Sequence, residues 1–131
     1  MKRLIVVFML LGFGSAATAQ PMPSDKFSAY LTEMITQLAV LTELASQCGE
    51  QLNNYGKDAT TGKECAEFDR KFHVRWESRD KLRDEIAELF RVVENGEQPC
   101  DDTCAAQVQR IEELRVTNTY YLDYIDFWKE F

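Results

Sequence analysis

Apolar residues recur at alternating intervals of four and three along residues 27–52, and most of the positions between them are polar. This spacing returns to one side of an α-helix and is typical of a helix that packs along a seam of the coiled-coil type. The apolar positions are Phe27, Leu31, Met34, Leu38, Leu41, Ala45, Cys48 and Leu52. We therefore predict a first helix over about residues 25–53.

Two further helices are indicated by similar apolar spacing and by residues that start and stop helices. Thr61 and Glu64 stand three residues apart, as in a capping box, and Gly96 favours the end of a helix. No segment alternates between apolar and polar residues with the turn signals of a β-strand. We predict helices over about residues 62–94 and 102–130, and an all-α fold in which three helices form an up-down-up bundle.

The start of the chain follows a different pattern. A basic start precedes an apolar run over residues 4–13, and small residues end in Ala-Thr-Ala at positions 17–19. This is the pattern of a secretory signal peptide, so we expect residues 1–19 to be removed and residues 20–131 to form one helical domain. The apolar run is shorter than the roughly 20 residues that cross a bilayer. We expect a periplasmic or secreted protein that is not inserted in a membrane after cleavage.

The charge balance excludes some classes of partner. The chain has 15 Lys and Arg against 22 Asp and Glu, which gives a net charge of −7. Loss of Lys2 and Arg3 with the signal peptide makes the remaining domain more acidic still. Sequence-independent binding to nucleic acid or to anionic lipid needs basic patches, so we expect neither partner. An acidic protein associates faster with a basic partner, which is compatible with protein binding.

Four cysteines in an exported chain predict two disulfides. Their number allows three pairings, but a second helix about 50 Å long would place Cys65 and Cys100 at opposite ends of the bundle. We therefore predict the pairs Cys48–Cys65 and Cys100–Cys104. Helical neighbours four residues apart hold their Cβ atoms about 5–6 Å apart, whereas a disulfide needs about 3.5–4.5 Å. Cys100 should thus precede the third helix, with Cys104 in its first turn.

One group of residues is a candidate metal site. Asp69, His73 and Glu77 have four-residue spacing and would project from one side of the second helix. Such a group can bind a divalent metal, or it can form a solvent-exposed ladder of ion pairs. The chain has no second histidine and no Cys-x-x-Cys pair to complete a zinc site. We predict no cofactor and keep these three residues as the metal-binding alternative.

A second group is a candidate polar layer inside the bundle. Counting outward from the loops places Arg79 level with Thr36 on the first helix and with Asn118 on the third. A polar layer of this kind can fix the register of the helices or line a ligand groove. The alternative is a small rotation of the second helix that leaves Arg79 in water.

The last twelve residues contain six aromatic residues, which form two stripes on the third helix. At 100° per residue, the first stripe spans about 60° and the second lies about 95° away. Both stripes can be buried between two helices, or the first can be a contact surface for another protein or a second copy. The second stripe is Tyr121, Ile125 and Trp128. The first stripe and its bordering acids are Tyr120, Tyr124, Phe127, Phe131, Asp123 and Asp126.

No catalytic constellation accompanies these features. The chain has one histidine, no Gly-x-Ser-x-Gly motif and no glycine-rich phosphate loop, so we do not expect an enzyme. We predict a small exported helical protein that binds another protein, as an inhibitor or an immunity factor would. The alternatives are a periplasmic holdase-type chaperone and a helical module that binds a metal or a small molecule.

Overall fold

A computed structural model describes residues 20–131, and the predicted signal peptide at residues 1–19 lies outside this part of the chain. The described residues form α-helices and no strand, which confirms the all-α prediction. Four α-helices take the place of the three that were predicted. The elements are α2 (Ser24–Tyr55), the 3₁₀ helix η1 (Gly56–Thr61), α3 (Lys63–Trp76), α4 (Arg79–Glu94) and α5 (Asp102–Lys129). Over residues 20–131, no helix is both long enough and apolar enough to cross a membrane.

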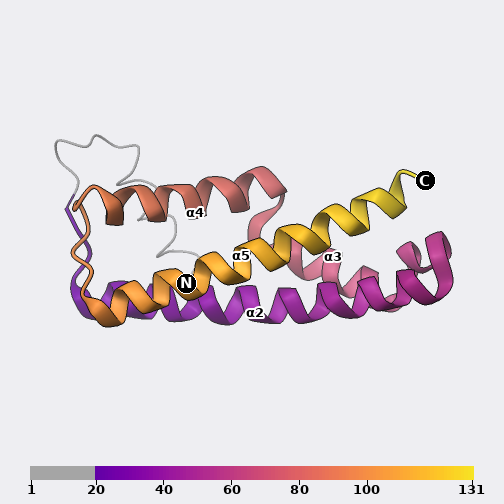
Figure 1. Cartoon of the computed structure of the whole chain (residues 1–131), viewed down its shortest axis with the longest axis horizontal. Coiled ribbons are helices and arrows are strands. Elements are labelled where there is room, and N and C mark those ends of the chain that lie inside the picture. The colour runs from indigo at the N-terminus through magenta and orange to yellow at the C-terminus, as the bar shows by residue number, and fades with distance from the viewer. Residues whose placement is uncertain (1–19) are drawn as a thin grey trace.

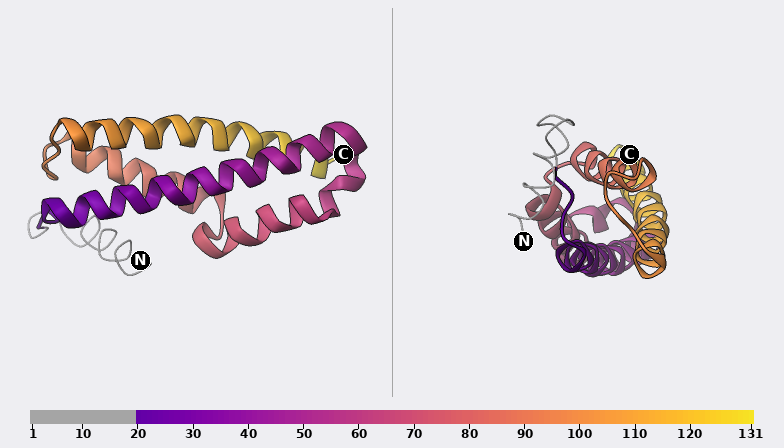
Figure 2. Two further views of the ribbon diagram at one scale, coloured as in Figure 1. Left: turned by 90° about the horizontal axis from the view of Figure 1, so that it is seen from below. Right: turned by 90° about the vertical axis from the view of Figure 1, so that its left-hand side faces the viewer.

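The helices are arranged around α2, which runs the length of the molecule (Figure 1). The chain turns at η1, returns along α3 and α4, and runs out again along α5, which lies beside α2 (Figures 1 and 2). Between α3 and α4 the chain steps sideways, so the two helices follow different lines. The C-terminus therefore lies at the same end of the molecule as η1.

The prediction of one continuous helix over residues 62–94 is wrong at Glu77 and Ser78. Glu77 has a φ of 70°, in the left-handed region that ends a right-handed helix, and α3 stops before it. The Ser78 side chain then accepts a hydrogen bond at 3.2 Å from the backbone N–H of Lys81, as the N-cap of α4. Asp80 in the first turn adds a negative charge where a helix start favours one. A stop and a cap therefore divide the predicted helix in two.

The hydrophobic core follows the predicted seam of α2. All eight apolar seam positions between Phe27 and Leu52 are buried, and none is more than 3% exposed. Apolar residues of α3 and α4 are buried in the same core, and on α3 the rings of Phe68 and Phe72 stack with their centroids 5.8 Å apart. The helical spacing therefore predicted the buried face of α2 correctly, although it did not predict the break between α3 and α4.

A buried carboxylate lies beside the helix break. Glu85 on α4 is 3% exposed, and it accepts hydrogen bonds from the indole N–H of Trp76 at 2.7 Å and from the Tyr30 hydroxyl at 2.8 Å. The Arg75 guanidinium donates to both carboxylate oxygens at 3.2 and 3.3 Å. Arg75 also donates to Gln37 and lies 4.2 Å from the centroid of the Trp76 ring. This Glu85 network joins α2, the end of α3 and α4.

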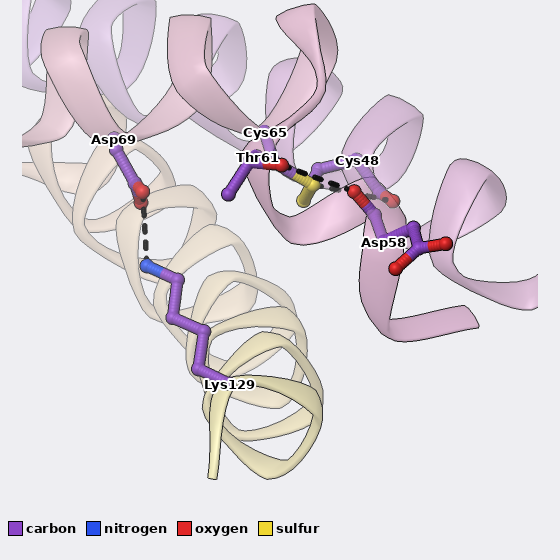
Figure 3. The surroundings of a disulfide bond; sticks show 6 residues. All are labelled: Cys48, Asp58, Thr61, Cys65, Asp69 and Lys129. Atoms are coloured by element: carbon purple, nitrogen blue, oxygen red, sulfur yellow. Dashed lines mark hydrogen bonds and ion pairs between the residues drawn. A yellow bond between two sulfur atoms is a disulfide. The ribbon is translucent and has the colours of Figure 1, made fainter. Parts of the chain in front are cut away.

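Both predicted disulfides are confirmed. Cys48 on α2 and Cys65 on α3 are bridged across the η1 turn, with their Cα atoms 4.5 Å apart (Figure 3). Cys100 precedes α5 and Cys104 lies in its first turn, with their Cα atoms 5.1 Å apart. The Asp101 side chain caps this helix by accepting a hydrogen bond at 2.9 Å from the Cys104 N–H. The local bridge therefore spans the start of α5, with Cys100 outside the regular helix and Cys104 inside it.

Removal of the Glu85 carboxylate tests the importance of this network. We expect Glu85→Ala to lower the free energy of unfolding by about 3–5 kcal/mol, because it leaves the Arg75 charge without its buried partner. Asp84→Ala is the matched control, because the Asp84 side chain is 63% exposed and should cost less than about 1 kcal/mol. Urea denaturation followed by circular dichroism measures both values. Equal losses in the two variants would show that the network does not hold the helices together.

The Tyr30 hydroxyl gives the network a pH dependence. Burial, followed by the charge of Glu85, raises the pKa of Tyr30 well above its usual value. The contribution of the protonated Tyr30 hydroxyl to the free energy of unfolding is therefore fully present below about pH 10. It is lost as the pH rises through the pKa that Tyr30 has in the folded state. We expect the free energy of unfolding to fall less steeply above about pH 10 in Tyr30→Phe than in the natural chain. The exposed-site control, Tyr120→Phe, should keep the steep fall, and the same slope in both variants would contradict the prediction.

Candidate functional site

The C-terminal half of α5 has an inner side that packs on the core. Leu122 and Ile125 are buried, with exposed fractions of 6% and 1%. Tyr121 and Trp128 are partly buried and pack against the same core. The structure therefore places the second aromatic stripe, Tyr121, Ile125 and Trp128, on the side of α5 that faces the other helices.

The opposite side of α5 carries an exposed row of apolar residues. Tyr120, Phe127 and Phe131 are 64%, 56% and 70% exposed, and Val116 extends the row by one turn at 53%. We call Val116, Tyr120, Phe127 and Phe131 the outer face. Sequence reasoning missed Val116, although its position four residues before Tyr120 is a signal that the two share a side.

Tyr124 lies at the border between the two sides of α5. It is partly buried, and its hydroxyl donates a hydrogen bond to the side-chain oxygen of Asn53 on α2. The backbone of α2 comes close at Gly49, where an added Cβ would lie 3.5 Å from the Tyr121 ring and 3.8 Å from the Tyr124 ring. A Cβ at these distances would make ordinary van der Waals contact, so both rings pack closely against α2 at this position. These contacts of Tyr121 and Tyr124 attach this side of α5 to α2.

The end of α5 is tied to the neighbouring elements. Lys57 on η1 donates hydrogen bonds to the carbonyl oxygens of Trp128 at 3.4 Å and Lys129 at 3.1 Å. Lys129 in turn pairs with Asp69 on α3 at 2.9 Å (Figure 3). The last carbonyl groups of a helix lack partners within the helix, and a cation there also suits the helix dipole. The outer face is therefore presented by a helix whose last turn is anchored.

The bordering acids of the outer face bind an arginine on α4. Asp126 accepts a hydrogen bond from Arg79 at 2.9 Å, and Asp123 accepts one from the same guanidinium. These contacts, with the hydrogen bond to Asp123 as the main cause, raise the pKa of Arg79. The side chains of Asp123 and Asp126 remain 64% and 42% exposed. Two carboxylates that share one guanidinium leave this border negatively charged.

The candidate polar layer of Thr36, Arg79 and Asn118 does not form, and the alternative, in which Arg79 is exposed to solvent, is confirmed. Arg79 lies at the surface with the two acids, and the Thr36 hydroxyl donates to the carbonyl oxygen of Thr32 in its own helix. Asn118 is fully buried, but its amide donates to the Thr42 hydroxyl oxygen at 3.1 Å. The count outward from the loops assumed an unbroken second helix, and the break at Glu77 and Ser78 invalidates that register.

The structure does not bring Asp69, His73 and Glu77 together as a metal site. Asp69 pairs with Lys129, and the left-handed backbone at Glu77 takes its side chain off the helical spacing that the prediction required. Between residues 20 and 131, no three or more His, Cys, Asp or Glu side chains are grouped closely enough to hold a metal ion.

Comparison with known proteins found no relative of this chain. No protein-family model, no curated protein and no solved structure matches the chain. Any function of this chain is therefore inferred from its own residues.

Two neighbouring residues on α5 test the division into an inner and an outer side. We expect Ile125→Ala to lower the free energy of unfolding by about 2–5 kcal/mol, because it opens a cavity in the core. Phe127→Ala should cost less than about 1 kcal/mol, because that ring is 56% exposed. Urea denaturation measures both, and a larger loss for Phe127→Ala would contradict the assignment of sides.

Proposed function

We propose that residues 20–131 form a small exported protein that binds another protein through the outer face of α5. The exposure of three aromatic rings along one side of an anchored helix is the observation that carries this proposal. A large exposed apolar patch generally marks a binding site, and aromatic residues are enriched in protein interfaces. Rings with few rotatable bonds also lose little conformational entropy when a partner covers them.

Export is supported by two independent features. The first nineteen residues have the pattern of a signal peptide, and both cysteine pairs are bridged. Disulfides form and persist in oxidising compartments such as the bacterial periplasm. A periplasmic or secreted partner follows from this location.

The shape of the site favours one defined partner. The outer face is a single row of residues along one helix, whereas a holdase-type chaperone needs a broad apolar surface for unrelated clients. The Glu85 carboxylate is buried and hydrogen-bonded within the fold, which suits a structural role better than a catalytic one. An inhibitor or an immunity factor, which binds one enzyme and blocks it, fits these properties.

A pull-down with matched variants tests the proposal. The oxidised domain, immobilised and exposed to an envelope extract of the source organism, should retain a protein at fixed stoichiometry. Phe127→Asp should lose at least nine-tenths of that protein, because a charge in the centre of an apolar interface must be desolvated. Val74→Asp, at a 65% exposed apolar position on α3, should retain it. Equal retention by both variants would exclude the outer face as the binding site.

A further inference from the structure

The charges around the outer face indicate the chemistry of its partner. Asp123 and Glu130 lie along one edge of the outer face, about 20° and 40° from Val116 in helical projection. Asp126 lies about 40° further round. Lys129, the one basic residue in residues 116–129 of α5, pairs instead with Asp69 on α3. Arg79 is the basic residue that the structure places among these acids, and it pairs with two of them.

This charge distribution argues against a second copy of the chain as the occupant. If two outer faces packed antiparallel, Asp123, near the middle of each face, would lie close to Asp123 of the other copy. Like charges at an interface are unfavourable, and each chain already carries a net charge of −7. A partner with basic residues along its contact surface would be attracted by these acids, whereas a second copy would be repelled by them.

The length of the outer face fits a helix. Val116 and Phe131 are fifteen residues apart on α5, which corresponds to about 22 Å, or four turns. Its four apolar residues lie within about 60° of one another in helical projection, and rows of side chains on one helix pack into the grooves of another. An amphipathic helix presents apolar anchors at intervals of three and four residues, with charges beside them.

We infer that the outer face binds a cationic amphipathic α-helix of its partner. This inference rests on the proposed function and adds the chemistry of the partner. The apolar side of that helix covers Tyr120, Phe127 and Phe131, and its Lys and Arg side chains lie beside Asp123, Asp126 and Glu130. Basic side chains next to aromatic rings also gain from cation–π contacts.

Calorimetric titration of the oxidised domain with designed 18-residue peptides tests this inference. A peptide of Leu and Lys with all Leu on one helical side should bind at a ratio of one to one. A peptide of the same composition with scrambled order should bind at least tenfold more weakly, and so should an amphipathic peptide with Glu in place of Lys. Equal binding of the scrambled peptide, or tighter binding of the Glu peptide, would overturn the inference.

Protein variants locate the contact. Tyr120→Ala with Phe127→Ala should weaken binding of the Leu/Lys peptide at least tenfold, whereas Val74→Ala should leave it unchanged. Asp123→Asn with Glu130→Gln should weaken binding several-fold and reduce its salt dependence. The control pair Asp84→Asn with Glu94→Gln removes the same charge from exposed positions on α4 and should change binding less than twofold. Equal effects of the two charge-matched pairs would show attraction to the whole acidic domain and overturn the inference.

The remaining outcomes separate this inference from the proposed function. If no peptide binds but the envelope pull-down still depends on Phe127, the helix is the wrong partner chemistry and the proposed function stands. If neither peptide nor envelope protein depends on the outer face, both are wrong. Light scattering tests whether a second copy covers the outer face. If the protein is a dimer at micromolar concentration and Phe127→Ala converts it to a folded monomer, the occupant is a second copy and the inference is wrong.

Discussion

The buried Glu85 carboxylate is the interaction on which the middle of the molecule depends. The chain leaves helical geometry at Glu77 and Ser78, and no run of backbone hydrogen bonds crosses that point. The side chains of Tyr30, Trp76 and Arg75 converge on one carboxylate instead, and this fixes α3, α4 and α2 relative to one another. A buried charge of this kind is tolerable only with all its partners present, so the network acts as a unit.

The position of α4 in turn affects the candidate binding site. Arg79, in its first turn, holds the carboxylates of Asp123 and Asp126 on α5. The outer face therefore receives support from two directions, through this arginine and through the Lys57 contacts at the end of α5. An exposed aromatic row is an aggregation hazard in a mobile segment, but here it lies on a helix that is anchored at its last turn.

Much of the fold could be predicted from the sequence, because helical spacing and cap residues are local signals. The seam of α2 required no knowledge of tertiary contacts, and the two disulfides followed from placing Cys65 and Cys100 at opposite ends of a bundle. The capping box expected at Thr61 and Glu64 does not form, because Gly62 is the N-cap of α3 and no side chain caps that helix. The break at Glu77 left only a gap in the apolar pattern, from Trp76 to Leu82, which is equally compatible with a polar layer in a continuous helix. The two sides of α5 were recognisable, but periodicity does not show how many neighbours a helix has. Packing against α2 decides which stripe is covered.

The two disulfides have a consequence for how the protein is made. Each joins cysteines that are consecutive in the sequence, Cys48 with Cys65 and Cys100 with Cys104. An oxidant that couples thiols in the order in which they emerge from a translocation channel would form the native bridges directly. In the exported protein that we propose, slow reshuffling of wrongly paired cysteines would then be unnecessary, so formation of its disulfides should not require a disulfide isomerase.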